Sequence, residues 1–182
     1  EEDGRGTYLL NSKDLNMSAH LSELAQAGVV SLKIEGRMKS EYYLATVVNA
    51  YRRILDDGYS AALAAELECV DHRSYTTAYA FGENNNTVHY EGAQAAGACE
   101  FVAVVRGHEN GRTYVEMRNR FYENEVLEAL SPTAPLAQKV TLSDLRDQSG
   151  APCADAKLVQ GVYSFSSPVA LTQGDILRRR RK

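Results

Sequence analysis

The stretch SLKIEGRMKSEYYLATVVNAYRRILDD (residues 31–57) changes its hydrophobic period halfway along and decides the fold of the N-terminal third. Residues 29–34 are mostly apolar and β-branched, which predicts a buried strand. From Ser40 the apolar residues recur every three or four positions, which predicts one apolar side of a helix that stops at Gly58. The residues on that side are Tyr43, Leu44, Val47, Val48, Tyr51, Ile54 and Leu55. The stretch therefore predicts one β–α unit.

Polar residues gather where this predicted strand ends and the helix begins, in the run Glu35-Gly36-Arg37-Met38-Lys39. In α/β folds this junction is the usual place for a functional site. The amides of a helix N-terminus carry partial positive charge, and Arg37 and Lys39 add full charges, so the junction would hold an anion while Glu35 fixes the arginine. An alternative of equal weight is an ion-pair network of Lys33, Glu35 and Arg37 that closes the end of a barrel.

A similar unit precedes this one. Residues 7–10 predict a brief strand, and residues 11–14 a turn in which Asn11 or Ser12 caps a helix that ends at Gly28. Two consecutive β–α units imply a parallel sheet, which needs more strands than two. Residues 1–60 are therefore expected to be the tail of a larger α/β domain of TIM-barrel type.

The pattern changes twice after Gly58. Residues 61–98 begin with an alanine-rich helix and continue as an extended connector. Residues 99–182 carry five or six short, half-polar strands, which predict a small closed or nearly closed β-barrel. Asn110-Gly111 predicts a hairpin turn, and the last strand, which ends at Arg178, is expected at a sheet edge. The predicted fold class is therefore α+β, with the C-terminal β–α units of a TIM-like α/β barrel followed by a small β-barrel domain.

The formal net charge of −4 is unevenly distributed. Residues 178–182 supply five positive charges, so the rest of the chain is acidic, which argues against a nucleic-acid-binding face over the whole chain. A short basic end of this kind favours a solvated terminus over a phosphate contact. No apolar run approaches the roughly 20 residues of a membrane-spanning helix, and residues 1–4 do not resemble a signal peptide. We predict a cytoplasmic protein without membrane contact; its oligomeric state is left open.

The sequence shows no metal-binding or nucleophile motif. Cys69, Cys99 and Cys153 are widely separated and include no C-x-x-C pair, so neither a disulfide framework nor a metal site is predicted. No serine lies in a G-x-S-x-G elbow, and the four histidines lie in unrelated contexts, so no catalytic triad is visible. Among the histidines, His72 beside Arg73 is kept as a site candidate.

The strongest set of candidate residues comes from the ends of the two predicted strands. Because neighbouring parallel strands end at the same rim, residues 11–14 and 33–39 are expected to lie close together. Arg37 is best suited to a carboxylate or phosphate, since a guanidinium can bond to it through two N–H groups. The catalytic candidates are Lys33, Glu35 and Arg37. The substrate-binding candidates are Asn11, Ser12, Lys13, Asp14, Lys39, His72 and Arg73.

Six blocks of the chain resemble the peptidase U32 family, the collagenase-like proteases: residues 8–15, 31–40 (followed by Tyr43 and Tyr51-Arg52), 72–77, 81–82, 101–105 and 118–121. They occur in the family's order at similar spacing. The resemblance implies a barrel-like α/β catalytic domain that begins upstream, and a C-terminal β-barrel similar to those of translation factors. It also implies upstream cysteines that bind an iron–sulfur cluster in several members. The three cysteines of this chain do not match those positions, so no cofactor is expected within these 182 residues.

The resemblance implies two activities. Relatives with this architecture act in RNA modification, including the prephenate-dependent hydroxylation of the wobble uridine of tRNA, whereas the family name denotes a peptidase. Because no protease triad is visible, we favour tRNA modification for the parent protein, with tRNA as its partner. The alternatives are a peptidase acting on a protein or peptide substrate, and a C-terminal barrel that only binds RNA or protein. The piece alone is expected to be inactive, because the residues that complete the pocket are expected before Glu1.

Overall fold

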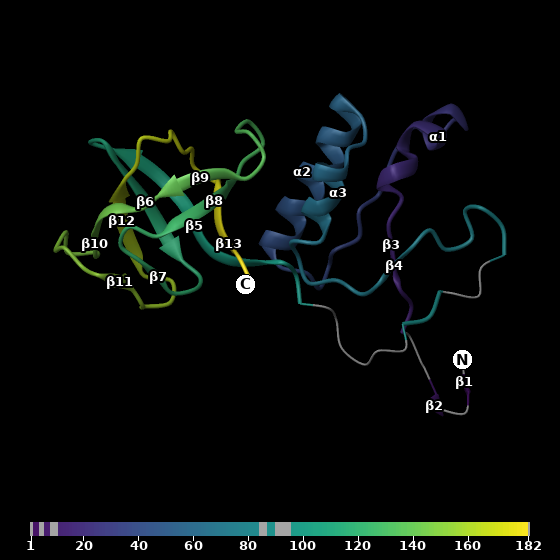
Figure 1. Ribbon diagram of the computed structural model, residues 1–182, viewed down its shortest axis with the longest axis horizontal. Helices are drawn as coiled ribbons and strands as arrows, with labels where there is room; N and C mark the ends of the chain where they lie inside the picture. The colour runs from purple at the N-terminus through teal and green to yellow at the C-terminus, as the bar shows by residue number, and fades with distance from the viewer. Residues whose placement is uncertain (1, 4–5, 8–10, 84–86, 90–95, 182) are drawn as a thin grey trace. The chain divides into compact units, whose positions relative to one another are not determined.

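The computed structural model describes residues 2–3, 6–7, 11–83, 87–89 and 96–181 (Figure 1). The chain divides into two compact units, Glu1–Ala98 and Cys99–Lys182, and each is described by itself. Unit 1 contains the helices and several very short strands, and unit 2 consists of strands and turns.

Two helices of unit 1 agree with the sequence prediction. Helix α2 spans Glu41–Asp57, and helix α3 spans Ala61–Leu67. The Ser40 hydroxyl caps α2 by accepting a hydrogen bond from the Tyr43 amide at 3.2 Å, and α2 ends at Gly58 with a φ of 88°. Ser60 caps α3 in the same way. The two helices lie side by side (Figure 1).

The buried side of α2 differs from the predicted stripe. Its buried residues are Tyr42, Thr46, Val47, Ala50 and Ile54. Leu44, Val48 and Leu55 were expected in the core, yet they are exposed. Helix α2 is therefore apolar over a wider arc than the described residues of unit 1 cover, and periodicity alone does not tell which part of that arc is packed.

The first helix is shorter than predicted. A 3₁₀ turn, η1 at Ser18–His20, leads into α1 at Leu21–Gln26, and neither has a side-chain N-cap bond. The predicted cap at Asn11 or Ser12 is wrong, because Ser12 forms a β-bridge with Val88 instead. Asn16 turns the chain, since its side-chain oxygen accepts the Ser18 amide at 3.0 Å.

The predicted buried strand at residues 29–34 is not formed in this structure. This segment has no strand partner among the described residues, and Val30 is 99% exposed. A strand forms only where a neighbour accepts and donates the backbone hydrogen bonds, and a periodic sequence does not supply that neighbour. Of the predicted strand at residues 7–10, residues 8–10 lie outside the described part of the chain. Gly6–Thr7 forms β2, paired with β1 at Glu2–Asp3.

The parallel pairing described in unit 1 joins β3 at Asp14–Leu15 to β4 at Tyr75–Thr76. The extended connector predicted after α3 therefore supplies the strand partner of residues 14–15. The described residues of unit 1 do not form the parallel sheet of a TIM-like barrel, so that part of the fold class stays a prediction.

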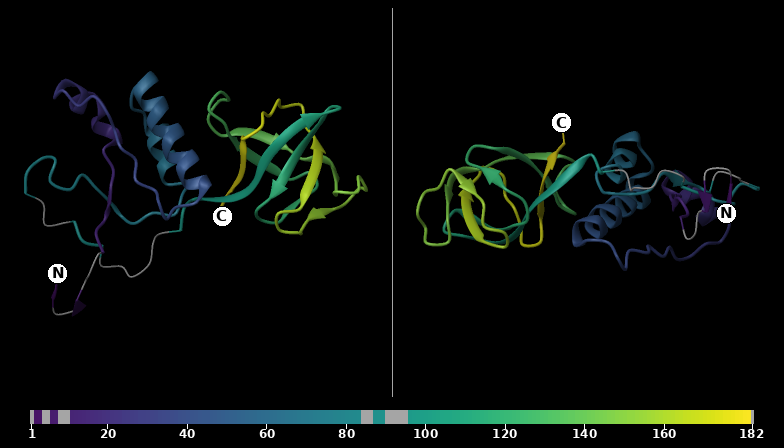
Figure 2. Two further views of the ribbon diagram at one scale, coloured as in Figure 1. Left: turned by 180° about the vertical axis from the view of Figure 1, so that it is seen from behind. Right: turned by 90° about the horizontal axis from the view of Figure 1, so that it is seen from below.

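Unit 2 is built on a seven-stranded antiparallel sheet that curls into a half-barrel (Figures 1 and 2). The strand order is β10-β12-β6-β5-β13-β8-β9. In chain order the strands are β5 Cys99–Glu109, β6 Arg112–Met117, β8 Val126–Leu130, β9 Gln138–Thr141, β10 Ser143–Arg146, β12 Val162–Ser166 and β13 Ile176–Arg180. A separate pair joins β7 at Phe121–Tyr122 to β11 at Asp155–Ala156.

The hairpin between β5 and β6 confirms the predicted turn. Asn110 and Gly111 both have positive φ, 51° and 74°, as a two-residue hairpin turn with the twist of its strands requires. Strand β6 alternates strictly, with Thr113, Val115 and Met117 buried and the residues between them partly exposed. The buried side faces a core that includes Val105, Phe121, Leu127, Val140, Phe165 and Leu177.

The last strand corrects two predictions. Strand β13 pairs with β5 on one side and β8 on the other, so it is a central strand and not an edge strand. Its arginines are not a solvated end: the Arg178 side chain is 0% exposed, and Arg179 and Arg180 form ion pairs. Glu128 on β8 lies opposite Arg178 and pairs with it at 3.3 Å, and Glu100 on β5 lies opposite Arg179.

Candidate functional site

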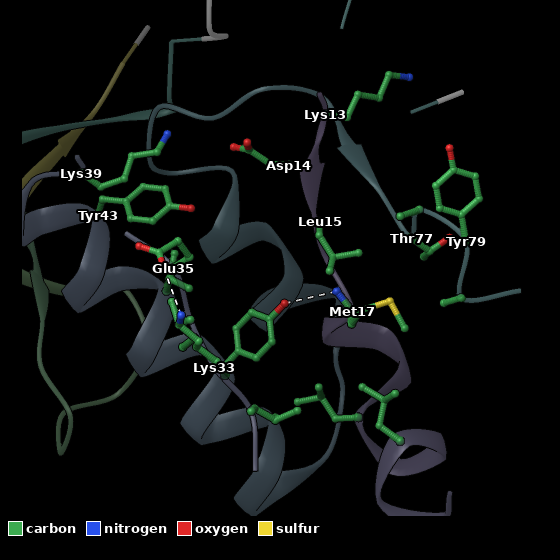
Figure 3. A pocket seen from close by; sticks show the side chains of 18 residues that line it. Lys13, Asp14, Leu15, Met17, Lys33, Glu35, Lys39, Tyr43, Thr77 and Tyr79 are labelled. Carbon is green, nitrogen blue, oxygen red and sulfur yellow. Dashed lines mark hydrogen bonds and ion pairs between the residues drawn. The ribbon is translucent and has the colours of Figure 1, made fainter. Parts of the chain in front are cut away.

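Unit 1 contains a cavity of about 670 Å³ (Figure 3). Its walls come from β3 and the turn after it, from residues 32–35, from α2 and from residues 77–80. The polar lining residues are Lys13, Asp14, Lys33, Glu35, Lys39, Tyr43, Tyr51, Thr77 and Tyr79. The apolar ones include Leu15, Met17, Leu21, Leu32 and Val47. Five of the ten candidate residues thus line one cavity: Lys13, Asp14, Lys33, Glu35 and Lys39.

Asp14 is held in place from the neighbouring strand. Its carboxylate accepts the Arg73 amide at 3.0 Å, and its own amide donates to the Ser74 carbonyl at 3.1 Å. The Asp14 side chain points toward Tyr43 across the cavity (Figure 3). Burial, and then the negative charge of Asp14, raise the pKa of the Tyr43 hydroxyl. Tyr43 therefore stays a neutral phenol that can donate a hydrogen bond.

Lys33 and Glu35 form an exposed pair at the cavity wall, with 3.4 Å between Lys33 Nζ and Glu35 Oε2. Glu35 also accepts the Arg37 backbone amide at 3.2 Å, and this bond, followed by the bond and charge of Lys33, lowers the pKa of Glu35. The sequence suggested that Glu35 binds the guanidinium of Arg37. In the structure Glu35 binds the backbone amide of Arg37 instead. The turn at residues 36–39 carries the Arg37 side chain outward, so Arg37 is exposed and does not line the cavity.

Lys39 and Tyr43 lie one above the other at the cavity rim (Figure 3). Lys39 Nζ is 4.7 Å from the centre of the Tyr43 ring and donates to the Asp71 carbonyl at 3.3 Å. The Tyr43 ring holds the Lys39 ammonium in place by a cation–π contact. The ammonium has N–H donors besides the one that is bonded to Asp71.

Tyr51 fixes the floor of the cavity. Its hydroxyl accepts the Met17 amide at 3.3 Å and donates to the side-chain oxygen of Asn16 at 3.2 Å (Figure 3 shows the first bond). Burial raises the pKa of Tyr51. Sequence reasoning placed Tyr43 and Tyr51 in the apolar stripe of α2 and missed both as site residues. The signal was present, because a tyrosine on an apolar stripe still brings a hydroxyl that needs a partner.

The remaining candidates do not line the cavity. His72 is buried, stacks on Tyr75 with 4.1 Å between ring centres, and has Nε2 3.0 Å from a Glu68 oxygen and Nδ1 2.7 Å from the Arg73 carbonyl oxygen. Arg73 donates from Nη1 to the Ser12 carbonyl at 3.0 Å, and Asn11 donates to the His89 carbonyl. The contacts of Arg73 and Asn11 join the connector to residues 11–14. They therefore help to hold the part of the cavity wall that Lys13 and Asp14 form.

The described residues contain no group of three or more His, Cys, Asp and Glu placed to hold a metal ion. Cys69 Sγ lies 3.7 Å from the Ala65 carbonyl oxygen, and burial raises the pKa of the Cys153 thiol, which favours the thiol over the thiolate. Within the described ranges, no helix has the length and apolar character needed to cross a membrane.

Two family descriptions match this chain. Peptidase family U32 matches residues 1–90, and the peptidase family U32 C-terminal domain matches residues 98–178. A solved C-terminal domain of a U32 peptidase from Geobacillus thermoleovorans is 21% identical, covers 44% of this chain and 99% of its own, and has a TM-score of 0.41.

Proteins named tRNA hydroxylation protein are similar over longer stretches. The Escherichia coli protein, tRNA hydroxylation protein P, is 34% identical over 82% of this chain and 34% of its own length. The Bacillus subtilis protein, tRNA hydroxylation protein P1, is 31% identical over 72% of this chain and 33% of its own length. The chain thus spans about a third of the length of these relatives. By both family descriptions and by these relatives, the chain belongs to the peptidase U32 family.

Proposed function

We propose that the protein acts in tRNA hydroxylation, as the prephenate-dependent 5-hydroxylation of the wobble uridine that the family resemblance implies. The observation that carries this proposal is the similarity to tRNA hydroxylation proteins, which extends over 82% of this chain and so across both units. The partner would be tRNA, and the compartment the cytoplasm. The chain spans about a third of the length of these relatives, so no chemical step is assigned to the cavity.

The cavity of unit 1 supports this proposal as part of the substrate site. An enzyme that modifies a base must take it out of the stack and hold its edge by hydrogen bonds. Asp14 and the Tyr43 hydroxyl offer an acceptor and a donor across the cavity, while Lys13, Lys33 and Lys39 offer positive charge for a phosphate or an anionic co-substrate. Asp14 and Tyr43 would orient the base, and the lysines would bind the anion.

The α/β part of the proposal concerns residues 29–34. We propose that this segment is a strand of a TIM-like barrel in the complete catalytic domain. Val29, Val30 and Leu32 are exposed together with Leu55 and line a groove of about 310 Å³. Contiguous apolar side chains of this kind are rarely left in water, and a strand on either side would cover them.

The proposed function is tested in cells. Deletion of the gene that encodes this chain should remove 5-hydroxyuridine-type nucleosides from tRNA, measured by mass spectrometry of digested tRNA. Complementation with an Asp14→Asn or Lys33→Ala variant should restore less of the nucleoside than the unchanged gene. Lys157→Ala, an exposed lysine of unit 2, is the matched control and should restore it fully. Unchanged nucleosides after the deletion would contradict the proposal.

A peptidase remains the second candidate. One observation favours it: Ser74 Oγ lies 3.3 Å from His89 Nδ1, a distance at which a histidine can accept a serine proton. Neither residue lines the cavity. Purified protein should then cleave casein, and Ser74→Ala should abolish the cleavage while the tRNA nucleosides of the cell stay unchanged. Cleavage that survives Ser74→Ala would remove this pair from the mechanism.

A further inference from the structure

The outward side of β6 in unit 2 is polar and carries guanidinium groups. Because β6 alternates strictly, Arg112, Tyr114 and Glu116 all point away from the core. Arg106 and Arg118 share the Glu116 carboxylate, with Arg106 Nη2 2.8 Å from Glu116 Oε2. The outer side of the sheet at this strand is therefore a row of charged groups with one aromatic ring in its middle.

Tyr114 lacks the large neighbours that an aromatic residue in a sheet normally packs against. Its cross-strand partners are Gly107 on β5 and Ser164 on β12. Cross-strand pairs of aromatic residues with large side chains are what usually cover such a ring. A glycine on one side and a serine on the other leave room beside the Tyr114 ring.

A hollow of about 340 Å³ lies beside Tyr114. It is bounded by β12, by the end of β10 and by the turn at residues 147–150, which contributes Gln148 and Ser149. Its volume is at the lower end of the range found for small-ligand sites. Val162 is the one aliphatic residue among those that line it, so the hollow offers no apolar anchor for a protein partner.

The charges around the hollow are arranged so that arginines share carboxylates. Asp144 lies between Arg112, at 2.6 Å, and Arg146, at 3.2 Å. Arg112 is structural, since it also donates to the side-chain and backbone oxygens of Ser164. Arg146 is 41% exposed and Arg106 is 45% exposed. A guanidinium has five N–H donors, so an exposed arginine bonded to one carboxylate can still bind a phosphate.

Two further carboxylates are near this surface. Asp147 lines the hollow, but its Oδ1 accepts hydrogen bonds from Ser149 and from the Ala151 amide within its own turn. Glu109 lies opposite Arg112 in the ladder. The surface is therefore close to neutral overall, and a ligand would be held by a stacked ring and a few placed arginines more than by a broad positive field.

We infer that the hollow beside Tyr114 binds an unpaired RNA nucleotide. The base stacks on the Tyr114 ring, the polar groups of Gln148 and Ser149 face its edge, and Arg146 and Arg106 contact the flanking phosphates. The inference rests on the proposed function for the choice of RNA as ligand. Protein interfaces with arginine and tyrosine usually add apolar anchors, whereas interfaces with nucleic acid are more polar, as this surface is.

The experiment is a fluorescence anisotropy titration of the 182-residue chain with a fluorescein-labelled oligouridine. Tyr114→Ala should weaken binding about 5- to 150-fold, the loss expected for one stacked base. Tyr114→Phe keeps the ring and should bind like the unchanged chain. A matching RNA duplex should bind more weakly than the single strand, because its bases are already stacked on one another.

The phosphate contacts are tested by salt. Two contacts to a single strand predict a slope of about −1.4 for the logarithm of the association constant against the logarithm of the salt concentration. Arg146→Gln or Arg106→Gln should reduce that slope to about −0.7. The circular dichroism spectrum and melting temperature of each variant show whether it is folded.

Arg120 and Tyr122 provide the matched control. They are another exposed arginine and tyrosine of unit 2, with the guanidinium 5.1 Å from the ring centre and paired with Asp155, and neither lines the hollow. Arg120→Gln and Tyr122→Ala should leave RNA binding unchanged. The inference is overturned if Tyr114→Ala binds normally, if the control variants lose as much, or if the folded chain binds no RNA.

The same variants separate this inference from the proposed function. In the complementation assay of tRNA nucleosides, the gene deletion tests the function and Tyr114→Ala tests the binding surface. If the deletion removes hydroxylated nucleosides but Tyr114→Ala neither weakens RNA binding nor lowers hydroxylation, the inference fails and the proposed function stands. If the deletion changes no nucleoside, the function fails, while the titration still reports whether the hollow binds RNA.

Discussion

Units 1 and 2 differ in how completely their strands are paired and their apolar side chains are buried. In unit 2, central strands are paired on both sides, and one core contains Phe121, Phe165 and most of the other large buried residues. In unit 1, residues 29–34 are extended without a strand partner among the described residues, and Val30 is almost fully exposed. The difference indicates that unit 2 is stabilised by contacts within itself, whereas unit 1 presents apolar surface that its described residues do not cover.

The largest expected effect is the loss of a core aromatic ring from unit 2. Phe165 on β12 is fully buried, so Phe165→Ala leaves a cavity and should lower the free energy of unfolding by about 3–5 kcal/mol. Urea unfolding followed by circular dichroism measures the loss of stability. Amide hydrogen exchange, measured on peptides of unit 2, shows whether its backbone amides exchange faster in the variant. Val126→Ala, an exposed position on β8, is the control and should change little. A loss below about 1 kcal/mol for Phe165→Ala would contradict a packed core in unit 2.

The next effect concerns the buried carboxylate beside β13. Glu128 contacts three cations, Lys139 at 2.8 Å, Arg180 at 3.0 Å and Arg178 at 3.3 Å. Glu128→Ala leaves the buried Arg178 without this carboxylate and should cost about 2–4 kcal/mol, less than for a fully buried pair because Lys139 is exposed. The free energy of unfolding in urea measures it. Asp155→Ala breaks a pair with the exposed Arg120 and should cost at most about 1 kcal/mol. Equal costs for the two variants would refute the special role of Glu128.

Acid is a milder way to disturb the same group. Burial alone would raise the pKa of Glu128. The hydrogen bonds from Lys139 and Arg180 and the charges of Arg180 and Arg178 lower it by more than burial raises it, so the pKa lies below the ordinary value of 4.5. The unfolded chain therefore takes up this proton at a higher pH than the folded one does. The contribution of Glu128 is present above pH 4.5 and is lost as the pH falls through the folded pKa. Unfolding in urea at pH 7, 5 and 3 should show the loss, and Glu128→Gln should reduce it. An unchanged pH dependence in Glu128→Gln would assign acid sensitivity to other carboxylates.

The contrast between the units also explains how far the sequence predicts this protein. Local signals were sufficient for two features in which a residue acts on its own neighbours: the Gly58 stop and the Asn110-Gly111 turn are both present. They were insufficient where the partner is distant along the chain. Residues 176–180 were expected at an edge because nothing near them in the sequence reveals β5 and β8 as neighbours on both sides.

The candidate site shows the same division. The sequence brought together residues 11–14 and 33–39 on the argument that two parallel strands share a rim. Lys13, Asp14, Lys33, Glu35 and Lys39 do line one cavity, whereas Asn11, Ser12 and Arg37 do not. The strands behind that argument are not the ones observed, since β3 pairs with β4 and residues 29–34 pair with no described strand. Tyr43 and Tyr51 were missed because an amphipathic helix pattern counts tyrosine as apolar and ignores its hydroxyl.

A smaller effect concerns helix α2, which carries one wall of the cavity. Ser40→Ala removes the oxygen that accepts the Tyr43 amide and should destabilise the start of α2 by about 1 kcal/mol. Hydrogen exchange of the amides at residues 41–44 should speed up accordingly. Ser60→Ala, which removes the equivalent cap of α3, is the comparison and should affect residues 61–64 instead. Unchanged exchange at the start of α2 would mean that Ser40 does not hold this helix end.

The smallest effect in this chain is expected at Val30, and it tests the proposed barrel strand. Val30 is 99% exposed here, so Val30→Ser should change the free energy of unfolding by less than about 0.5 kcal/mol. In a longer protein that includes the rest of the α/β domain, a paired strand would bury this side chain. The same substitution should then cost about 1.5–3 kcal/mol, the usual value for a buried valine. Urea unfolding of both proteins gives the two numbers. A cost near zero in both would show that residues 29–34 stay exposed and would remove the support for a barrel strand, whereas a large cost in the 182-residue chain would mean that unit 1 already covers this segment.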